Sequence, residues 1–207
     1  MECVGFYDDQ VLPRAINVLL GNRECQKLRA RAVAGLEGEV LEVGFGSGLN
    51  MPLYPSEVSK VLAVDPATVG RKLAADRVAA SPIPVEYVGL DGQSLPLRDE
   101  SVDHALSTWT LCTIPDVRRA LDEVRRVLRP GGTLHFLEHG LSTDPKVAKW
   151  QHRLTPLERR IAGGCHFDRD IDALLADADF TITREDHFCM RGPKTMGTMY
   201  EGVAAKP

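Results

Sequence analysis

Short apolar runs separated by polar turns recur along the middle of this chain. Runs of four to six residues that predict buried strands lie at 39–43, 61–64, 85–88, 102–107 and 133–137. A helix is expected over 68–80, and the stretch 117–128 has the apolar period of a helix that Asp116 can cap. Strand and helix therefore alternate from Glu39 to Leu137, which is typical of a parallel sheet covered by helices on both faces.

The two ends of the chain depart from this alternation. Residues 6–35 are largely helical by the same criterion, with an interruption at Gly21-Asn22. The last third predicts a helix over 145–161 that carries Trp150 and Leu157, a second helix over 171–178, closing strands at 181–183 and 198–204, and a loop at 191–194 between them. No internal repeat interrupts this order, so we expect one domain.

Three alternate glycines follow the first strand run. Gly44, Gly46 and Gly48 permit positive φ and let a ligand approach the main chain. The dinucleotide fingerprint needs its third glycine three positions after the second, where this chain has Leu49. The pattern is therefore GxGxG with Glu42 just ahead of it, which favours a nucleotide-like cofactor, although an ordinary strand-to-helix turn is the alternative.

Carboxylates end the next two predicted strands. Asp65 lies 21 positions after Gly44, where a carboxylate can accept both ribose hydroxyls of a nucleoside; it could instead cap the helix that begins near Thr68. Asp91-Gly92 follows the third strand and suits a hydrogen bond from the exocyclic amine of an adenine. The same pair is also an ordinary turn sequence.

Composition narrows the class of protein. The 207 residues include 25 Lys and Arg against 29 acids, a net charge of −4, and give no basic excess that would indicate nucleic-acid binding. The apolar runs are far shorter than the ~20 residues that span a bilayer, and residues 1–9 lack the form of a signal peptide. We therefore expect a cytoplasmic protein without an integral membrane segment. The five cysteines form no CxxC pair, so free thiols are expected.

The order of these motifs resembles that of class I S-adenosylmethionine-dependent methyltransferases, in the branch of the ubiquinone/menaquinone C-methyltransferases. The motifs are Leu41-Glu42-Val43-Gly44-x-Gly46-x-Gly48, Asp65, Leu90-Asp91, the Val102-Asp103 strand and Val127-Leu128-Arg129-Pro130-Gly131-Gly132. The resemblance implies an α/β, Rossmann-like, doubly wound and mostly parallel seven-stranded sheet with helices on both faces and the last strand antiparallel. It also implies S-adenosyl-L-methionine as the cofactor. The expected cofactor-binding residues are Glu42, Gly44, Gly46, Gly48, Asp65, Pro66, Asp91, Gly92, Thr108 and Trp109.

A closer likeness extends beyond this core. Ser107-x-x-x-Leu111-Cys112-Thr113, Glu138-His139, the Trp150 helix and Gly164-Cys165-His166-x-x-Arg169 are similar to the methyltransferase-like thiol S-methyltransferases. The apolar N-terminal membrane segment of those proteins has no counterpart in this sequence. We therefore expect residues 1–207 to form one methyltransferase domain: a helical extension at 1–38, a cofactor-binding core at 39–138 and a substrate-side region at 139–207.

The implied reaction is methyl transfer to a small-molecule acceptor, either a thiol, a phenol or a quinone-like compound. Orienting donor and acceptor can supply roughly 7–11 kcal/mol, so no enzyme nucleophile is needed. A proton must leave a thiol or hydroxyl acceptor, and His139 and His166 are the candidate catalytic bases, unless they only support the framework. Trp109 and Cys112 could line the substrate site, with Cys112 as a small buried residue in the alternative.

Several points stay open from the sequence. No metal site is expected, since Cys165, His166 and Asp168 lack a second ligand pair at a recognised spacing. Tyr7 and Asp8 could contact the cofactor or only anchor the N-terminal helix. A non-catalytic cofactor-binding module is an alternative function, and a nicotinamide-dependent oxidoreductase is disfavoured by Leu49. Neither the methylated atom nor the oligomeric state follows from the sequence.

Overall fold

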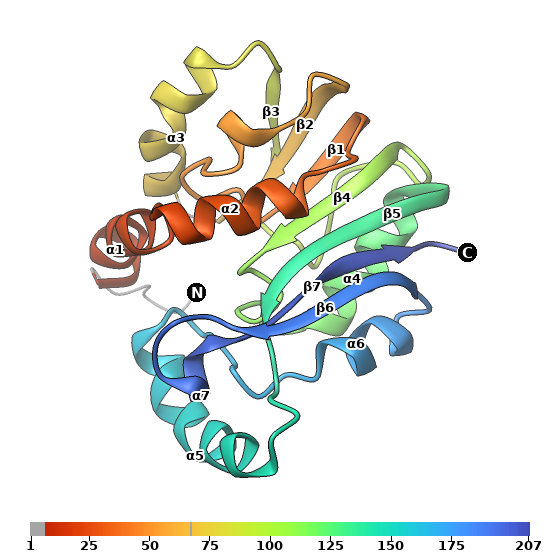
Figure 1. Cartoon of the computed structure of the whole chain (residues 1–207). Coiled ribbons are helices and arrows are strands. Elements are labelled where there is room, and N and C mark those ends of the chain that lie inside the picture. The colour runs from red at the N-terminus through yellow and green to blue at the C-terminus, as the bar shows by residue number, and fades with distance from the viewer. Residues whose placement is uncertain (1–6, 67) are drawn as a thin grey trace.

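A seven-stranded sheet forms the centre of the molecule. The structure, a computed structural model, describes residues 7–66 and 68–207. The strand order is β3-β2-β1-β4-β5-β7-β6 (Figure 1). The strands are β1 Gly38–Val43, β2 Val58–Val64, β3 Val85–Gly89, β4 Val102–Thr108, β5 Leu128–His139, β6 Thr181–Cys189 and β7 Thr198–Ala205. The first five pair in parallel, whereas β7 is antiparallel to both neighbours, which confirms the predicted fold class.

The helices also follow the predicted order. They are α1 Leu12–Leu19, α2 Arg23–Ala32, α3 Thr68–Ala80, α4 Val117–Val127, α5 Pro145–Ile161, α6 Ile171–Asp177 and α7 Lys194–Gly197, with a π-helical turn at Tyr7–Val11 and a 3-10 turn at Met51–Leu53. Asn22 caps α2 through bonds from two main-chain amides, and Asp116 caps α4 by accepting from the amide of Arg119. The break expected at Gly21-Asn22 therefore separates α1 from α2.

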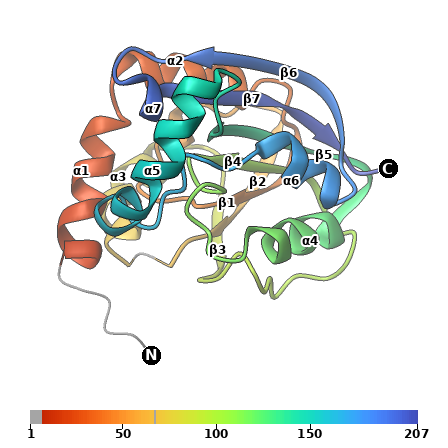
Figure 2. The ribbon, with the colours of Figure 1, turned by 90° about the horizontal axis from the view of Figure 1, so that it is seen from below.

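Two apolar cores lie on opposite faces of the sheet. Val40 and Val61 pack in the cluster that contains Leu28 of α2, whereas Leu41 and Leu62 pack in the cluster that contains Leu121 of α4. Successive residues of a strand point to opposite faces, so each buried strand serves both cores. Figures 1 and 2 show α2 on one side of the sheet and α4 and α6 on the other.

The chain reverses its direction of winding between β1 and β4. From β1 it proceeds outward to β2 and β3, then returns to add β4 and β5 on the other side. In open α/β sheets, ligands bind at the carboxyl ends of the strands at such a switch point. The candidate site is therefore expected where β1 ends at Val43 and β4 ends at Thr108.

Some predicted boundaries were wrong. β5 begins at Leu128 instead of Thr133, because Leu128 pairs with Val102 of β4 and the main chain of Gly131 and Gly132 pairs with that of Lys206. The predicted loop at 191–194 includes the start of the one-turn helix α7. β6 extends to Cys189 instead of ending near Thr183. The prediction was too short because the outer half of this edge strand is charged and lacks an alternating apolar pattern.

Helix α5 buries a polar face. Gln151, Thr155 and Glu158 are its buried residues, whereas Trp150 is 54% exposed and Leu157 is 57% exposed. The apolar residues of α5 therefore do not mark its packed side. Within the described part of the chain, no helix is both long enough and apolar enough to cross a bilayer. Three parts of the expectations lie outside the described residues: residue 6 of the N-terminal helical stretch, Cys3 among the five cysteines, and the side chain of Asp8.

Candidate functional site

The glycine turn lies at the carboxyl end of β1. The main-chain amide of Gly44 donates to the carbonyl of Val64, 2.9 Å away, which fixes the turn against β2. Gly44 has a φ of 78°, and a Cβ there would collide with Thr110. Gly46 has a φ of 54°, but a Cβ there would meet no atom closer than 3.9 Å. The turn is therefore tightly held at Gly44 and leaves open space beside the main chain at Gly46.

The carboxylate of Asp65 contacts this turn directly. Asp65 follows β2, is 7% exposed, and accepts a hydrogen bond of 2.7 Å from the amide of Gly46. Pro66 continues the chain on the surface. The structure thus brings together the two strongest features that the sequence indicated, the glycines and the acidic residue after the second strand.

The turn after β3 also approaches this edge. A Cβ on Gly92 would lie 3.1 Å from a methyl group of Val43 at the end of β1. Asp91 accepts bonds of 2.8 and 3.0 Å from the amide and side chain of Gln93. This contact is the turn alternative for Asp91, and it fixes the orientation of the carboxylate.

A buried network of hydrogen-bonded polar side chains lies next to the glycine turn. Glu42 accepts hydrogen bonds of 2.8 Å from Asn50 and 2.6 Å from the Tyr54 hydroxyl, and burial raises the pKa of Glu42 to about 7. Arg29 donates to Asn50 at 2.9 Å and to Thr108 at 2.8 Å. The network therefore joins α2, the end of β1 and the end of β4.

Arg29 and Asn50 are site residues that the sequence analysis did not identify. Arg29 is 5% exposed, and burial lowers its pKa to about 10. One signal was available: Arg29 shares the buried face of α2 with Cys25, Leu28 and Ala32, where an isolated charge requires a partner.

Trp109 has an unusual conformation at the end of β4. Its φ is 54°, a value that a residue with a side chain adopts only at a cost of order 1–3 kcal/mol. The guanidinium of Arg29 lies 4.7 Å from the centre of its ring. The buried indole N–H has no acceptor among the described residues. Strain of this kind and an unpaired donor are both typical of a ligand site.

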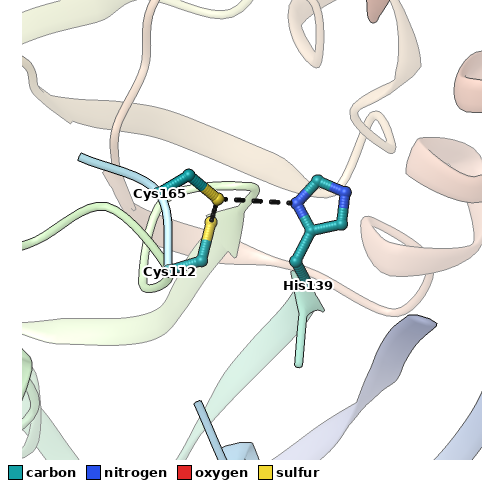
Figure 3. Close-up of side chains that lie close together, drawn as sticks. All are labelled: Cys112, His139 and Cys165. Atoms are coloured by element: carbon teal, nitrogen blue, oxygen red, sulfur yellow. Dashed lines mark hydrogen bonds between the residues drawn. The ribbon is translucent and has the colours of Figure 1, made fainter. Parts of the chain in front are cut away.

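A second group of side chains meets beyond Trp109. Cys112 lies in the loop after β4, His139 ends β5 and Cys165 follows α5, and Figure 3 shows their side chains pointing toward one another. The two sulfur atoms are 3.2 Å apart, and Sγ of Cys165 is 3.9 Å from Nδ1 of His139. The sulfur–sulfur contact with Cys112 and the nearby His139 lower the pKa of Cys165 to about 6, against the effect of burial.

The two predicted histidines have different surroundings. His139 faces the thiols and stacks edge-on against Phe167, with ring centres 4.9 Å apart. His166 instead directs Nδ1 at the carbonyl oxygen of Cys112, 3.2 Å away, and burial lowers its pKa. Of the two, His139 is the one that the structure places in a cluster of reactive side chains.

Glu138 and Arg169 fix the loop that carries Cys112. Glu138 is fully buried and accepts hydrogen bonds from the Ser107 hydroxyl and from the amides of Thr110 and Cys112, at 2.7, 3.0 and 3.3 Å. Arg169 donates to the carbonyl groups of Leu111 and Ile114 in the same loop. The position of the Cys112 thiol is therefore determined by the scaffold.

Comparisons with known proteins agree with this geometry. Residues 41–136 match the methyltransferase domain family. The chain is 34% identical over 151 residues to the thiol S-methyltransferase TMT1B of Rattus norvegicus, covering 70% of this chain and 61% of that protein. It is 32% identical over 120 residues to a demethylmenaquinone methyltransferase of Clavibacter sepedonicus, covering 58% of this chain and 49% of that protein. This chain belongs to the class I S-adenosylmethionine-dependent methyltransferases.

Solved structures confirm the fold of this methyltransferase. A SAM dependent methyltransferase from Aquifex aeolicus superposes with a TM-score of 0.65 at 20% identity, covering 94% of this chain and 98% of that one. The [4+2]-cyclase SpnF superposes with a TM-score of 0.69 at 20% identity, covering 89% of this chain and 80% of that one. The methyltransferase spans less than two thirds of the length of its thiol S-methyltransferase relatives.

S-adenosylmethionine is the cofactor of this class, and the residues present fit it. The main chain at Gly46 is accessible, a carboxylate lies beside it at Asp65, and the Trp109 indole offers a buried donor. These features could hold the adenosyl and amino-acid parts of the cofactor.

Proposed function

We propose that this methyltransferase transfers the methyl group of S-adenosylmethionine to the sulfur of a small-molecule thiol. The bond between Asp65 and the Gly46 amide carries the cofactor part of the proposal, because it joins the two predicted cofactor-binding elements at the switch point of the sheet. The names of the relatives support the acceptor part, since the first matches are thiol S-methyltransferases.

The cofactor would lie across the carboxyl ends of β1, β2 and β4. Its amino-acid end would contact the main chain of the glycine turn, above Glu42, and its ribose would bind Asp65 next to Pro66. The adenine would lie by Asp91 and Gly92, and the methyl group would be directed past Thr108 and Trp109 toward the acceptor. The proposed cofactor-binding set is Glu42, Gly44, Gly46, Gly48, Asp65, Pro66, Asp91, Gly92, Thr108 and Trp109.

The reaction exchanges one carbon–sulfur bond for another. The acceptor sulfur forms a bond to the methyl carbon while the sulfonium–methyl bond breaks, and its electron pair stays on the sulfur of S-adenosylhomocysteine. The thiol proton has to leave before or during attack. We assign His139 as the protein group that accepts this proton. His166 is the weaker candidate, because its Nδ1 faces a carbonyl oxygen.

An assay for S-adenosylhomocysteine release tests the proposal. Purified protein is incubated with S-adenosylmethionine and a series of small thiols, catechols and quinols. We expect release with thiols above the rate without acceptor. Release only with catechols or quinols would contradict the thiol assignment and would favour the phenolic or quinone-like alternative, to which the demethylmenaquinone relative points.

Two other functions predict different results in the same assay. A non-catalytic module would bind S-adenosylmethionine with no release for any acceptor. That alternative has a specific basis, because the fold is shared with the [4+2]-cyclase SpnF, so fold alone does not identify the reaction. A nicotinamide-dependent oxidoreductase would bind a nicotinamide dinucleotide tightly, which Leu49 in the glycine pattern disfavours.

A further inference from the structure

Three side chains of the kinds that bind metal ions in proteins converge from three separate segments of the chain. Cys112, His139 and Cys165 are distant in sequence, yet one ligand atom from each lies within 4.8 Å of the others (Figure 3). The expectation of no metal site rested on the absence of a second ligand pair near Cys165, and folding supplies that pair. The sulfur atoms are 3.2 Å apart, well beyond the 2.03–2.05 Å of a disulfide, so both groups are thiols.

The spacing of the three atoms is close to that of a tetrahedral zinc site. Zinc binds cysteine sulfur at about 2.3 Å and histidine nitrogen at about 2.0–2.1 Å, which places two sulfurs about 3.8 Å apart and a sulfur and nitrogen about 3.5 Å apart. The corresponding distances here are 3.2 and 3.9 Å. Shifts of a few tenths of an ångström, within the range of side-chain rotation, would bring all three atoms to bonding distance.

The surroundings of the cluster resemble the supporting groups of a metal site. Glu138 fixes the Cys112 amide, and Phe167 packs against the ring of His139. Glu158 is only 7% exposed, interacts electrostatically with Cys165 and His139, and its Oε2 has no partner in the described part of the chain. A carboxylate near a ligating histidine is a common second neighbour of a bound metal, and it orients the ring.

We propose that Cys112, His139 and Cys165 bind one zinc ion, with the fourth position left for the sulfur of the acceptor. Three protein ligands with one open position are typical of catalytic zinc sites, and a set of two cysteines and one histidine is among those known. The inference deepens the proposed function. The identity of the acceptor rests on that function, whereas the binding of a metal by these three residues is independent of it. The cluster lies next to the cofactor turn, because Thr110 of the same loop packs against Gly44.

With His139 as a ligand, the metal would take over the role assigned above to His139 as a free base and would promote loss of the acceptor's proton. A thiol that coordinates zinc is deprotonated, so the acceptor binds as a thiolate and one proton is released to solvent. The thiolate sulfur then forms the bond to the methyl carbon, and the sulfonium sulfur keeps the electrons of the broken bond. The product is a neutral thioether, a poorer ligand than a thiolate, and it leaves the open position for the next acceptor.

A cobalt titration tests the metal site without any assay of activity. Reduced protein is stripped with a chelator and titrated with Co²⁺, and thiolate-to-cobalt charge-transfer absorption in the near ultraviolet reports binding; Zn²⁺ is then added in competition. We expect one equivalent to bind. Cys112→Ser, Cys165→Ser and His139→Ala should each weaken binding by at least about 100-fold, and Glu158→Gln by about 10-fold. Cys189→Ser is the matched control, because Cys189 is an exposed thiol outside the cluster.

Absence of the absorption band, or a band unchanged in the Cys112 and Cys165 variants, would overturn the proposal. So would a Cys112–Cys165 disulfide in the oxidised protein together with no metal binding after reduction. Retained S-adenosylmethionine binding in each variant shows that it is folded, since the cofactor site uses other residues.

The acceptor assay separates this inference from the proposed function. Chelation should abolish S-adenosylhomocysteine release with thiols, and Zn²⁺ should restore it. If cobalt binds as expected but no thiol is methylated, the proposed function fails and the metal site stands. If thiols are methylated equally well after chelation and by Cys165→Ser, the proposed function stands and the zinc-activated thiolate is excluded.

Discussion

The guanidinium of Arg29 donates a hydrogen bond of 2.8 Å to the hydroxyl of Thr108, and both residues are buried. Arg29 lies in the N-terminal helical extension, whereas Thr108 is the last residue of β4. The extension is therefore joined to the carboxyl edge of the sheet by a buried charged contact. The extension therefore does more than cover the core, because the guanidinium of Arg29 also lies over the ring of Trp109.

Removal of Arg29 should destabilise the fold and weaken cofactor binding together. Arg29→Ala removes the donor to the Asn50 side-chain oxygen and one of the two donors to the Thr108 hydroxyl, and it removes the positive charge near Glu42. We expect a loss of about 3 kcal/mol in the free energy of unfolding, measured by urea denaturation. Arg23→Ala on the exposed first turn of α2 is the control and should change it by less than about 0.5 kcal/mol. Equal effects of the two substitutions would show that the buried network contributes little.

Asp65 should contribute directly to cofactor affinity. If its carboxylate accepts ribose hydroxyls, Asp65→Ala should weaken S-adenosylmethionine binding by about 1.5–3 kcal/mol for each charged hydrogen bond lost, as measured by calorimetry. Asp76→Ala, an exposed carboxylate on α3, should leave the affinity unchanged. An unaltered dissociation constant in the Asp65 variant would remove the ribose assignment, even if the protein still binds the cofactor.

The fold was predictable because its signals are local. Buried strands, helix periods, the break at Gly21-Asn22 and the cap at Asp116 each depend on a few consecutive residues, and the structure confirms them. The β6 edge strand was predicted too short, since its charged outer half lacks the apolar face that marks a strand. Gly46 and Asp65 were found because strand ends in a parallel sheet meet at one edge, so their spatial relation follows from the fold class.

The rest of the site depends on contacts between distant segments. Arg29 and Thr108 are 79 residues apart, and Cys112 and Cys165 are 53 residues apart. No spacing rule connects such pairs before the packing of α2 and α5 is known. The resemblance to thiol S-methyltransferases drew attention to Cys112, His139 and Cys165 separately, but only the structure shows them as one cluster.

Substitution of Gly46 should separate backbone strain from loss of the cofactor. Both Gly46 and Gly35 have positive φ, 54° and 82°, and a Cβ at either position meets no protein atom within about 3.9 Å. Alanine should therefore cost about 1–2 kcal/mol of stability at both sites, as measured by thermal unfolding. Only Gly46→Ala places a methyl group where the cofactor is expected, so only this variant should lose S-adenosylmethionine binding. Loss of binding in both variants would attribute the effect to stability instead of to contact.

The buried carboxyl of Glu42 should make stability depend on pH in a specific direction. Burial raises the pKa of Glu42 from an ordinary value of 4.5 to about 7 in the folded protein. Between these values the folded state holds more protons than the unfolded state, so the free energy of unfolding falls as pH rises. The contribution is fully present below about pH 4.5 and is lost as pH rises through about 7, with a size on the order of 3 kcal/mol.

Comparison of the parent protein with Glu42→Gln isolates this contribution. Burial lowers the pKa of His135 to about 4, so its contribution has the opposite sign and is lost as pH falls below about 6.5. The pH profile of stability of the parent protein alone therefore combines two opposing effects. The contribution of His135 is present in both proteins and cancels when the stability of Glu42→Gln is subtracted from that of the parent. Urea denaturation from pH 4.5 to 8 should show the parent losing stability relative to Glu42→Gln as pH rises, with most of the change below pH 7. A difference that does not vary with pH would mean that Glu42 is ionised throughout this range and is held by Arg29 as an ion pair.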